Sequence, residues 1–453
     1  MEKLRITEIQ ISNLFEELSY DIKLPLEKPI SIITAPNGRG KTTLLNLISF
    51  VFDPGIDSFK LIRSVPFDFF RCTLSNGKIV ELKKENLESI EKYSKTIKSA
   101  ALRESNVGRI RAIFDNSDFI FTVYDGNKKI SEPIDFAKVF LSARDIELSE
   151  LFEDDDEDYS VVRSHRSTMY YRYRYLWKLI QDCLHDYDCF IPVKFIKADR
   201  IQPLPLPPSR MREFEQPKQI SPLEDASDKI GKRIKEATDN YYNEVSLAKD
   251  KLPEMFIEDN GGDLESDDFI DQWSDYRKEL TQFQDIGLIT PTKDFTEGKN
   301  IREVYSEKGK FLSTYIWAFK DTTDPLKDIY ARLNLFKSIL DERNEITGKK
   351  VSFSPDGVKI HVGDRELSLE TLSSGEKHDF IMFYDLILAG DNNGLMLIDE
   401  PEISLHIEWQ ESYLDKLLKI CEMNNFQFII ATHSPNIVSS HYDFLVDKGE
   451  VDG

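Results

Sequence analysis

The feature that most restricts this chain is a glycine-containing turn between an apolar segment and an apolar helix. Residues Ile30 to Thr34 are rich in β-branched side chains and predict a strand, and residues 41–48 carry the apolar spacing of a helix. Between them lies Ala-Pro-Asn-Gly-Arg-Gly, residues 35–40, followed by Lys41 and Thr42. A strand, a glycine turn and a helix N-terminus in this order present backbone N–H groups to phosphate. The sequence therefore predicts a nucleotide site here.

The residue types of this turn suit separate roles in phosphate binding. Gly38 and Gly40 let the backbone approach phosphate oxygens without a Cβ in the way. Lys41 would reach the β- and γ-phosphates, and the Thr42 hydroxyl would hold Mg²⁺. The first glycine of the usual pattern is Ala35 here, which a backbone with negative φ tolerates. The simpler alternative, an accidental Lys-Thr pair beside a turn, does not explain the flanking strand and helix.

Composition narrows the class of protein. The chain of 453 residues is long enough for about two or three domains. It has no apolar run of about eighteen residues and no signal-like start, so we expect a cytoplasmic protein without a membrane partner. Its four cysteines lack the spacing of a metal site or a disulfide framework. A net charge of −22 and a pI near 4.9 favour protein partners over nucleic acid.

Two neighbouring segments of opposite charge leave nucleic-acid binding open. Residues 153–158 are all acidic, whereas residues 163–175 are rich in arginine and tyrosine. The basic segment could stack on single-stranded nucleic acid and neutralise its backbone. It suits equally well an arm that binds the acidic run or an acidic partner, or a solvated helix face.

The β-rich ends of the chain are separated by a helical pattern. Apolar residues recur at three- and four-residue spacing between Ile230 and Leu252, as an amphipathic helix requires. Further helices are predicted for residues 270–283 and 311–340, with a break near Pro325. Because residues 222–342 contain no histidine or cysteine, we interpret this block as an insertion rather than a catalytic domain.

The pattern predicts three parts. Proline-rich residues 202–208 mark the first boundary, because consecutive prolines stop both helix and strand pairing. An N-terminal ATPase lobe would span residues 1–205, with the phosphate loop, a β-hairpin at residues 67–82 that turns at Asn76-Gly77, and the charged insert. A helical, coiled-coil-like insertion would follow at residues 206–345. A C-terminal ATPase lobe would span residues 346–453.

The C-terminal part carries residues that would complete the site. Leu395 to Glu400 reads as an apolar strand ending in two carboxylates, at the sheet edge where α/β folds bind ligands. Asp399 would hold Mg²⁺, and Glu400 would orient and deprotonate a water molecule. A second apolar strand, residues 426–431, leads to His433. We interpret His433 as a γ-phosphate sensor; the alternative is a hydrogen-bonded core histidine.

A third segment, Thr371 to His378, opens another helix. Ser373 and Ser374 are suitable N-cap residues, and Gly375 beside them exposes backbone N–H groups. The simplest interpretation is a helix start. The functional interpretation is a second anion-binding helix N-terminus.

Together these motifs resemble ABC-type ATPases of the RecF/SMC/OLD branch. The Leu-Ser-Ser-Gly-Glu run at 372–376 resembles their signature motif, although its third and fifth residues depart from the commonest Leu-Ser-Gly-Gly-Gln form. Asp-Glu-Pro-Glu-Ile-Ser-Leu-His at 399–406 and Ala-Thr-His-Ser-Pro at 431–435 follow in the same order. The resemblance covers about half of the chain. It implies an α/β fold: an ABC-type ATPase head with a mixed sheet, of the P-loop NTPase class, split by a helical insertion.

More narrowly, residues 372–435 resemble the ATPase subunit (AriA-like) of the PARIS anti-phage defence system, which pairs with a separate TOPRIM-like nuclease effector. The resemblance implies a site shared head-to-tail by two subunits, in which Ser373 and Gly375 of one cap the γ-phosphate bound by the other. The expected nucleotide contacts are Asn37, Gly38, Gly40, Lys41, Thr42, Thr43, Ser373, Gly375 and Glu376. The expected catalytic residues are Glu400 and His433, and the expected Mg²⁺ contacts are Thr42, Asp399 and a sensing glutamine, for which Gln202 is the nearest candidate.

We therefore expect a slow, oligomer-dependent ATPase that uses ATP and Mg²⁺ and acts as a switch or scaffold in anti-phage defence. It would sense a trigger, a phage-encoded protein by resemblance, and sequester or activate a separate effector, expected to be a nuclease. It would form a homo-oligomer, at least a dimer, and a hexamer is compatible with the resemblance. Because only a short segment follows Pro435, we expect no TOPRIM-like domain in this chain.

The alternative class is a RecF/SMC-like ATPase of DNA repair or maintenance. It would need a basic surface, for which residues 163–174 are the candidate. DNA binding that weakens with salt and stimulates hydrolysis would favour this class. A motor subunit of a membrane transporter is disfavoured by the long helical insertion.

Overall fold

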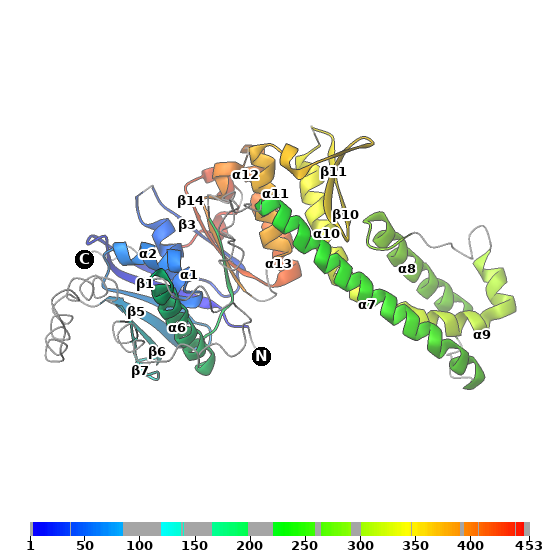
Figure 1. The fold of residues 1–453 in the computed structure, drawn as a ribbon, viewed down its shortest axis with the longest axis horizontal. Coiled ribbons are helices and arrows are strands. Elements are labelled where there is room, and N and C mark those ends of the chain that lie inside the picture. Colours follow the sequence, from blue (N-terminus) through cyan, green and yellow to red (C-terminus); the bar gives the residue numbers. More distant parts are fainter. Residues whose placement is uncertain are drawn as a thin grey trace. The chain divides into compact units, whose positions relative to one another are not determined.

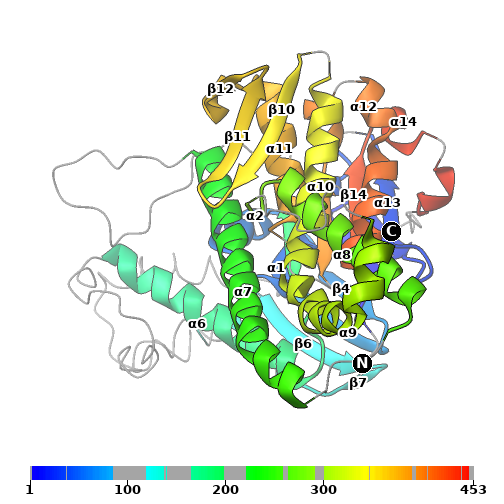
Figure 2. The ribbon, with the colours of Figure 1, turned by 90° about the vertical axis from the view of Figure 1, so that its right-hand side faces the viewer.

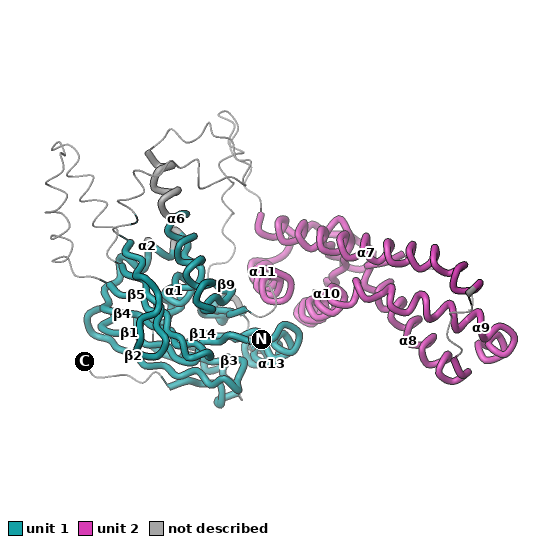
Figure 3. The backbone as a smooth tube through the Cα atoms, turned by 90° about the horizontal axis from the view of Figure 1, so that it is seen from below, with its two compact units in different colours: residues 1–200, 206–217, 390–453 teal, residues 201–205, 218–389 magenta. Residues whose placement is uncertain are grey.

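The computed structural model describes residues 3–36, 38–84, 119–136, 139, 165–197, 221–258, 264–290, 300–345, 347–389, 394–405, 407–439 and 441–447. The chain divides into two compact units (Figure 3). Unit 1 comprises residues 1–200, 206–217 and 390–453, and unit 2 comprises residues 201–205 and 218–389. The acidic run at 153–158 and two expected site residues, Asn37 and Gln202, lie outside the described residues.

A four-stranded parallel sheet forms the centre of unit 1. Its order is β3 (Ile30–Thr34), β14 (Gln427–Thr432), β13 (Leu395–Asp399) and β9 (Val193–Ile196). Figure 1 shows β3 beside β14, although they lie at opposite ends of the sequence. Every residue of β13 and β14 is buried, which explains their continuous apolar sequences. The strands predicted at residues 30–34, 395–400 and 426–431 are confirmed as β3, β13 and β14. Because the sheet is parallel, their carboxyl ends share one edge.

The second sheet of unit 1 is antiparallel. Its strands run in the order β2 (Leu18–Lys23), β1 (Ile6–Leu14), β4 (Phe69–Leu74), β5 (Lys78–Lys84), β6 (Phe119–Asp125) and β7 (Lys128–Lys129), and β8 (Ile134–Asp135) pairs with β6. The predicted hairpin between β4 and β5 is confirmed. Gly77 in its turn has φ 81°, a conformation that glycine adopts without strain.

Helix α1 (Lys41–Phe52) contributes to a core that includes residues of both sheets. Nine of its twelve residues are buried, so the helix has only a small solvent-exposed face and its amphipathic character is weak. Around Phe50 gather the rings of Phe59 and Phe136, with centroids 5.8 and 6.2 Å away. The other helices of unit 1 are α2 (Ile56–Ser64), α6 (His165–Asp186), η7 (Pro401–Ser404), α12 (Ile407–Glu411), α13 (Tyr413–Asn424), α14 (Pro435–Val438) and η8 (Tyr442–Phe444).

Unit 2 contains the predicted helical block. Its helices are α7 (Pro222–Glu258), α8 (Ser266–Asp285), α9 (Ile301–Phe319), η5 (Lys320–Thr323) and α10 (Asp324–Arg343). Pro325 lies in the first turn of α10, which confirms the predicted break. A three-stranded antiparallel sheet, β10 (Lys349–Ser354), β11 (Gly357–Val362) and β12 (Arg365–Leu367), packs against α7 and α10 (Figure 2). None of the described helices combines the length and apolarity that a bilayer span requires.

Unit 2 continues beyond the helical block through η6 (Leu369–Thr371) and α11 (Ser374–Ile387). Helix α10 contacts α11 through the Phe336 and Phe380 rings, 5.2 Å apart, and through Arg332, whose Nη1 donates to the Ile387 carbonyl at 2.6 Å. The compact unit therefore ends at residue 389, past the sequence-based boundary at 345. The division into functional lobes at 205 and 345 stays a prediction.

Candidate nucleotide site

The glycine turn has the backbone that a phosphate loop requires. Gly38 and Gly40 have φ values of 83° and 77°, in the left-handed region that glycine favours. At Gly40 space also matters, because a Cβ there would lie 2.6 Å from Leu14 Cδ2. Ala35 is not among the residues with positive φ, so its methyl group is tolerated as expected. Helix α1 begins at Lys41, and its N-terminus closes the turn.

Lys41 lies within this loop. Its side chain is buried, and its Nζ donates to the Ala35 carbonyl at 2.6 Å and to the Pro36 carbonyl at 3.2 Å. From the neighbouring sheet, the Tyr20 hydroxyl donates to the Arg39 carbonyl at 3.0 Å. The two bonds from Nζ hold the Lys41 ammonium against the loop, where it can neutralise phosphate charge. Thr43 is the third residue of α1 and lies in its first turn.

Thr42 and Asp399 meet although 357 positions separate them in the sequence. The Thr42 Oγ1 donates to Asp399 Oδ2 at 2.8 Å, and Asp399 Oδ1 is buried with no hydrogen-bond partner in the structure. Burial raises the pKa of Asp399, and the nearby carboxylates of Glu400 and Glu402 raise it further, against the hydrogen bond from Thr42. An unpaired carboxylate oxygen beside a hydroxyl is a donor set that suits Mg²⁺. The residues therefore fit this cation.

Replacing Asp399 by asparagine tests whether this buried carboxylate destabilises the nucleotide-free protein and binds Mg²⁺. A carboxyl group with a raised pKa is disfavoured when ionised, so its cost to folding appears as pH rises through the folded-state pKa. At pH 7 we expect Asp399→Asn to leave the melting temperature of the nucleotide-free protein unchanged or raised. It should lose the increase that Mg-ATP gives the wild type in differential scanning fluorimetry. The exposed Asp250→Asn serves as control, and a fall of about 5 °C in the nucleotide-free variant would contradict the expectation.

Glu400 occupies a strained turn directly after β13. Its φ and ψ are 44° and 59°, a left-handed conformation uncommon for a residue with a Cβ. Its backbone N–H donates to the Ala431 carbonyl at 2.9 Å, so the turn is tied to the neighbouring strand β14. The side chain is partly exposed, with 23% of its surface accessible. The carboxylate is therefore available to a water molecule at the sheet edge.

His433 follows β14 and faces the same edge. Its Nδ1 lies 3.7 Å from Glu400 Oε1 and 3.0 Å from Glu402 Oε1. The structure thus brings together the two residues expected to be catalytic, and adds Glu402, which the sequence reasoning did not select. The only sequence signal for Glu402 is its place as the second acid of the Asp-Glu-Pro-Glu run.

The signature-like segment belongs to unit 2 and begins α11. Ser373 is the N-cap: its Oγ accepts from the Glu376 N–H at 3.3 Å, and its own N–H donates to Glu376 Oε2 at 2.7 Å. Lys349 Nζ lies 2.8 Å from both carboxylate oxygens of Glu376. Burial alone would raise the pKa of Glu376, but the Lys349 ammonium and the Ser373 donors lower it. Glu376 is thus an ionised residue that holds the helix start.

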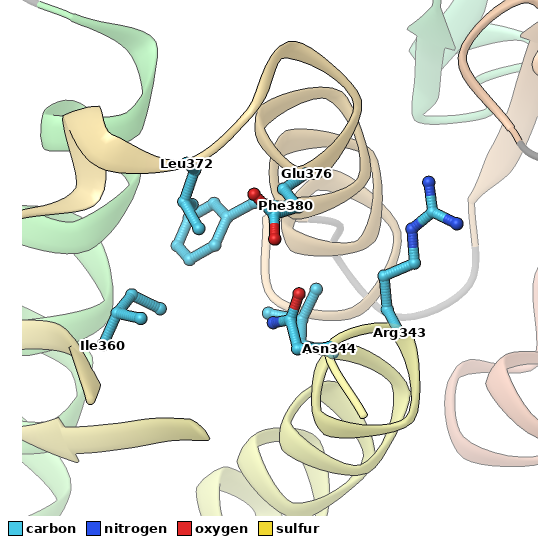
Figure 4. A pocket seen from close by; sticks show the side chains of 7 residues that line it. Arg343, Asn344, Ile360, Leu372, Glu376 and Phe380 are labelled. Atoms are coloured by element: carbon cyan, nitrogen blue, oxygen red, sulfur yellow. The ribbon is translucent and has the colours of Figure 1, made fainter. Parts of the chain in front are cut away.

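Below this helix start lies a small pocket (Figure 4). It is lined by Leu340, Arg343, Asn344, Ile360, Leu372, Glu376 and Phe380. The Glu376 carboxylate, committed to Ser373 and Lys349, is part of its wall. The expected contact of Glu376 with nucleotide, and the capping of γ-phosphate by Ser373 and Gly375 of a second subunit, stay predictions.

Comparison with known proteins identifies a family that matches most of this chain. The family described as "AAA ATPase domain" matches residues 4–438. Among curated proteins, the chain is 26% identical to "Retron Ec83 probable ATPase" of Escherichia coli over 36% of its length, and 26% identical to "Septu protein PtuA" of Bacillus thuringiensis over 35%. It is 32% identical to "Retron Vc95 probable ATPase" of Vibrio cholerae serotype O1 biovar El Tor over 21%. The matches span 30%, 44% and 21% of those proteins, less than half of each.

Two solved structures align over 99% of this chain with low similarity. They are the Smc head domain with an extended coiled coil bound to the C-terminal domain of ScpA, derived from Pyrococcus furiosus, and the recombination mediator protein RecF. Their TM-scores are 0.37 and 0.32, their identities 12% and 11%, and the alignments cover 96% and 98% of those chains. The expected fold class is confirmed by the family match and the phosphate-loop geometry: a mixed α/β ATPase head, interrupted by helices.

Proposed function

This chain belongs to the AAA ATPase domain family, and on that premise we propose that it is an ATP-hydrolysing switch of an anti-phage defence system. The observation that carries the ATPase activity is the convergence of three loops at one sheet edge. They are the phosphate loop with Lys41, the β13 end with Asp399 and Glu400, and the β14 end with His433.

Each of these residues has a distinct task in hydrolysis. Lys41 and the N–H groups of the loop bind the phosphates and neutralise their charge. Thr42 and Asp399 would hold Mg²⁺, which when bound supplies charge stabilisation to the phosphoryl group. Glu400 positions a water molecule and takes its proton, because its carboxylate is partly exposed at the strand end. His433, when its ring is protonated at both nitrogens, would donate a hydrogen bond toward the γ-phosphate.

The defence role rests on the motif resemblance and is supported by the relatives named for retrons and Septu. We infer that the chain acts with a separate effector, of the TOPRIM-like nuclease class that the PARIS resemblance implies. A phage-encoded protein would be the trigger, and a homo-oligomer the active state. Because the chain spans less than half of these relatives, its partners are inferred from the motifs.

One experiment separates the parts of this proposal. Purified protein should hydrolyse ATP in a reaction that EDTA stops, and the rate per subunit should rise with protein concentration. The product of a neighbouring nuclease gene, when present, should copurify with it, and cells carrying both should resist phage. Hydrolysis without phage resistance would overturn the defence role, and absence of hydrolysis at any concentration would overturn the ATPase role.

Replacing Ser373 by arginine tests the shared site. The change removes the N-cap acceptor and places a cation at the positive end of α11. We expect ATP binding to one chain to stay within about twofold, because Ser373 lies outside the phosphate loop, while hydrolysis falls about tenfold or more. Light scattering after gel filtration should show loss of ATP-dependent association. Ser373→Thr keeps a capping hydroxyl and should behave as wild type. Wild-type hydrolysis by Ser373→Arg would contradict the shared site.

A RecF/SMC-like role in DNA maintenance is the second candidate. The observation that favours it is that residues 165–175 of the arginine- and tyrosine-rich segment form the start of helix α6. A helix carrying several arginines can follow a nucleic-acid backbone. Binding of single-stranded DNA that weakens as salt increases and accelerates ATP hydrolysis would favour this function over the defence switch.

A further inference from the structure

The Glu402 carboxylate binds three consecutive residues of the loop that carries His433. Its Oε1 accepts from the Thr432 hydroxyl at 2.7 Å, from the His433 N–H at 2.9 Å and from the Ser434 N–H at 3.2 Å. The Glu402 side chain is 7% exposed, so these bonds form away from bulk water. Charge-assisted hydrogen bonds to a buried carboxylate are the strong ones. One oxygen atom thus fixes three consecutive residues.

Resting on the ATPase function proposed above, we propose that Glu402 is a positioning residue that sets the orientation and the tautomer of His433. The His433 Nδ1 lies 3.0 Å from the same Glu402 oxygen and 3.7 Å from Glu400 Oε1. A carboxylate can only accept, so the contact places the proton of the neutral ring on Nδ1. Nε2 of the neutral ring then carries no proton, so it can donate to a phosphate only when the ring is protonated at both nitrogens.

This arrangement gives the two glutamates different tasks. Glu402 is buried and accepts hydrogen bonds from the loop that carries His433. Glu400 is more exposed, and its Oε1 lies 3.7 Å from the His433 Nδ1, too far for a good hydrogen bond. Glu402 holds the imidazole from behind, as carboxylates do for functional histidines in other enzymes. Glu400 is left to act on water. A histidine ring held in this way does not have to turn when the γ-phosphate arrives.

Gln410 reinforces the same loop from a second side. Its Oε1 accepts from the Ser434 hydroxyl at 2.7 Å, and its Nε2 donates to the carbonyls of Leu405 at 3.0 Å and Glu402 at 3.4 Å. The segment after Glu400 is therefore bound to the histidine loop by both side chain and backbone. This leaves Glu402 little freedom to turn away from His433.

The kinetic test compares Glu402→Gln with the matched control Glu411→Gln, an exposed glutamate on α12. Glu402→Gln keeps the side-chain length and one acceptor but can turn an NH₂ group toward Nδ1. We expect kcat for ATP to fall about 10- to 100-fold with ATP affinity changed less than about twofold. In the double variant with His433→Ala the two losses should not multiply, because both act through the ring. Multiplying losses, or equal loss of binding and kcat, would overturn the proposal.

A spectroscopic test does not depend on variants that hydrolyse ATP. In protein labelled with ¹⁵N-histidine, the ring signals of His433 are those missing from His433→Gln. In the wild type at pH 8 they should show the tautomer protonated at Nδ1, and Glu402→Gln should shift them toward the Nε2 tautomer. An Nε2 tautomer in the wild type would overturn the proposal even when Glu402→Gln fails to fold. A wild type that hydrolyses no ATP would instead overturn the proposed function alone.

Discussion

Replacing Glu400 by glutamine should lower the rate of ATP hydrolysis about a thousandfold while ATP still binds, because a positioned general base contributes about 10²- to 10⁴-fold to such reactions. The introduced amide would keep the size and the polar contacts of the side chain but could not take a proton from water. The strained turn is held by the bond from the backbone N–H of Glu400 to the Ala431 carbonyl, which the substitution does not touch. Single-turnover hydrolysis of radiolabelled ATP measures the loss.

The same Glu400→Gln variant should accumulate in the ATP-bound, associated state. If two subunits close over ATP and hydrolysis releases them, gel filtration with Mg-ATP should show a larger species that persists longer than in wild type. The matched control is Glu422→Gln, an exposed glutamate on α13. Hydrolysis by Glu400→Gln at the wild-type rate would show that Glu400 is not the base.

Replacing Lys41 by alanine should weaken ATP binding about a hundredfold or more, since a hydrogen bond from a charged group contributes about 1.5–3 kcal/mol and this ammonium would make several. The side chain is buried inside the loop, where its charge is poorly screened. Isothermal titration calorimetry with ATP measures the affinity without requiring hydrolysis.

The control for Lys41→Ala is Lys83→Ala, which removes an exposed ammonium of β5 and should leave ATP affinity unchanged. Lys41 also donates to the carbonyls of Ala35 and Pro36, so its loss leaves two acceptors to water. Circular dichroism should show that the sheets persist, because the core around α1 does not involve Lys41. If Lys41→Ala bound ATP with wild-type affinity, the phosphate loop would not be the ATP-binding site.

Short-range sequence patterns were sufficient to predict several strands and helices of this fold. The continuous apolar sequences of β13 and β14 indicated strands buried on both faces, and Asn76-Gly77 indicated the hairpin between β4 and β5. The spacing between Ile230 and Leu252 predicted a helix, and α7 extends beyond it at both ends. These features depend on residues within a few positions of one another. Single-sequence reasoning is strongest for such short-range interactions.

The pairing of strands that lie far apart in the sequence could not be predicted from the sequence. The parallel order β3, β14, β13 and β9 joins segments from three distant parts of the chain. The motifs indicated that these strands exist but did not indicate which strand lies beside which. Glu376 shows the same limit: in the structure its carboxylate binds Lys349 and the Ser373 N–H, partners that the motif did not indicate. The ion pair between Lys349 and Glu376 forms only because the tertiary structure brings the start of α11 close to the start of β10.

The sequence alone determined the identity of the phosphate loop, because glycine backbones, a helix N-terminus and a following lysine act within about ten residues of each other. Only the tertiary structure decided that Thr42 bonds Asp399, and that Glu402 rather than Glu400 is the nearer carboxylate to His433. The physical reason is that hydrogen bonds require atoms within about 3 Å, a condition that strand pairing imposes and sequence spacing does not.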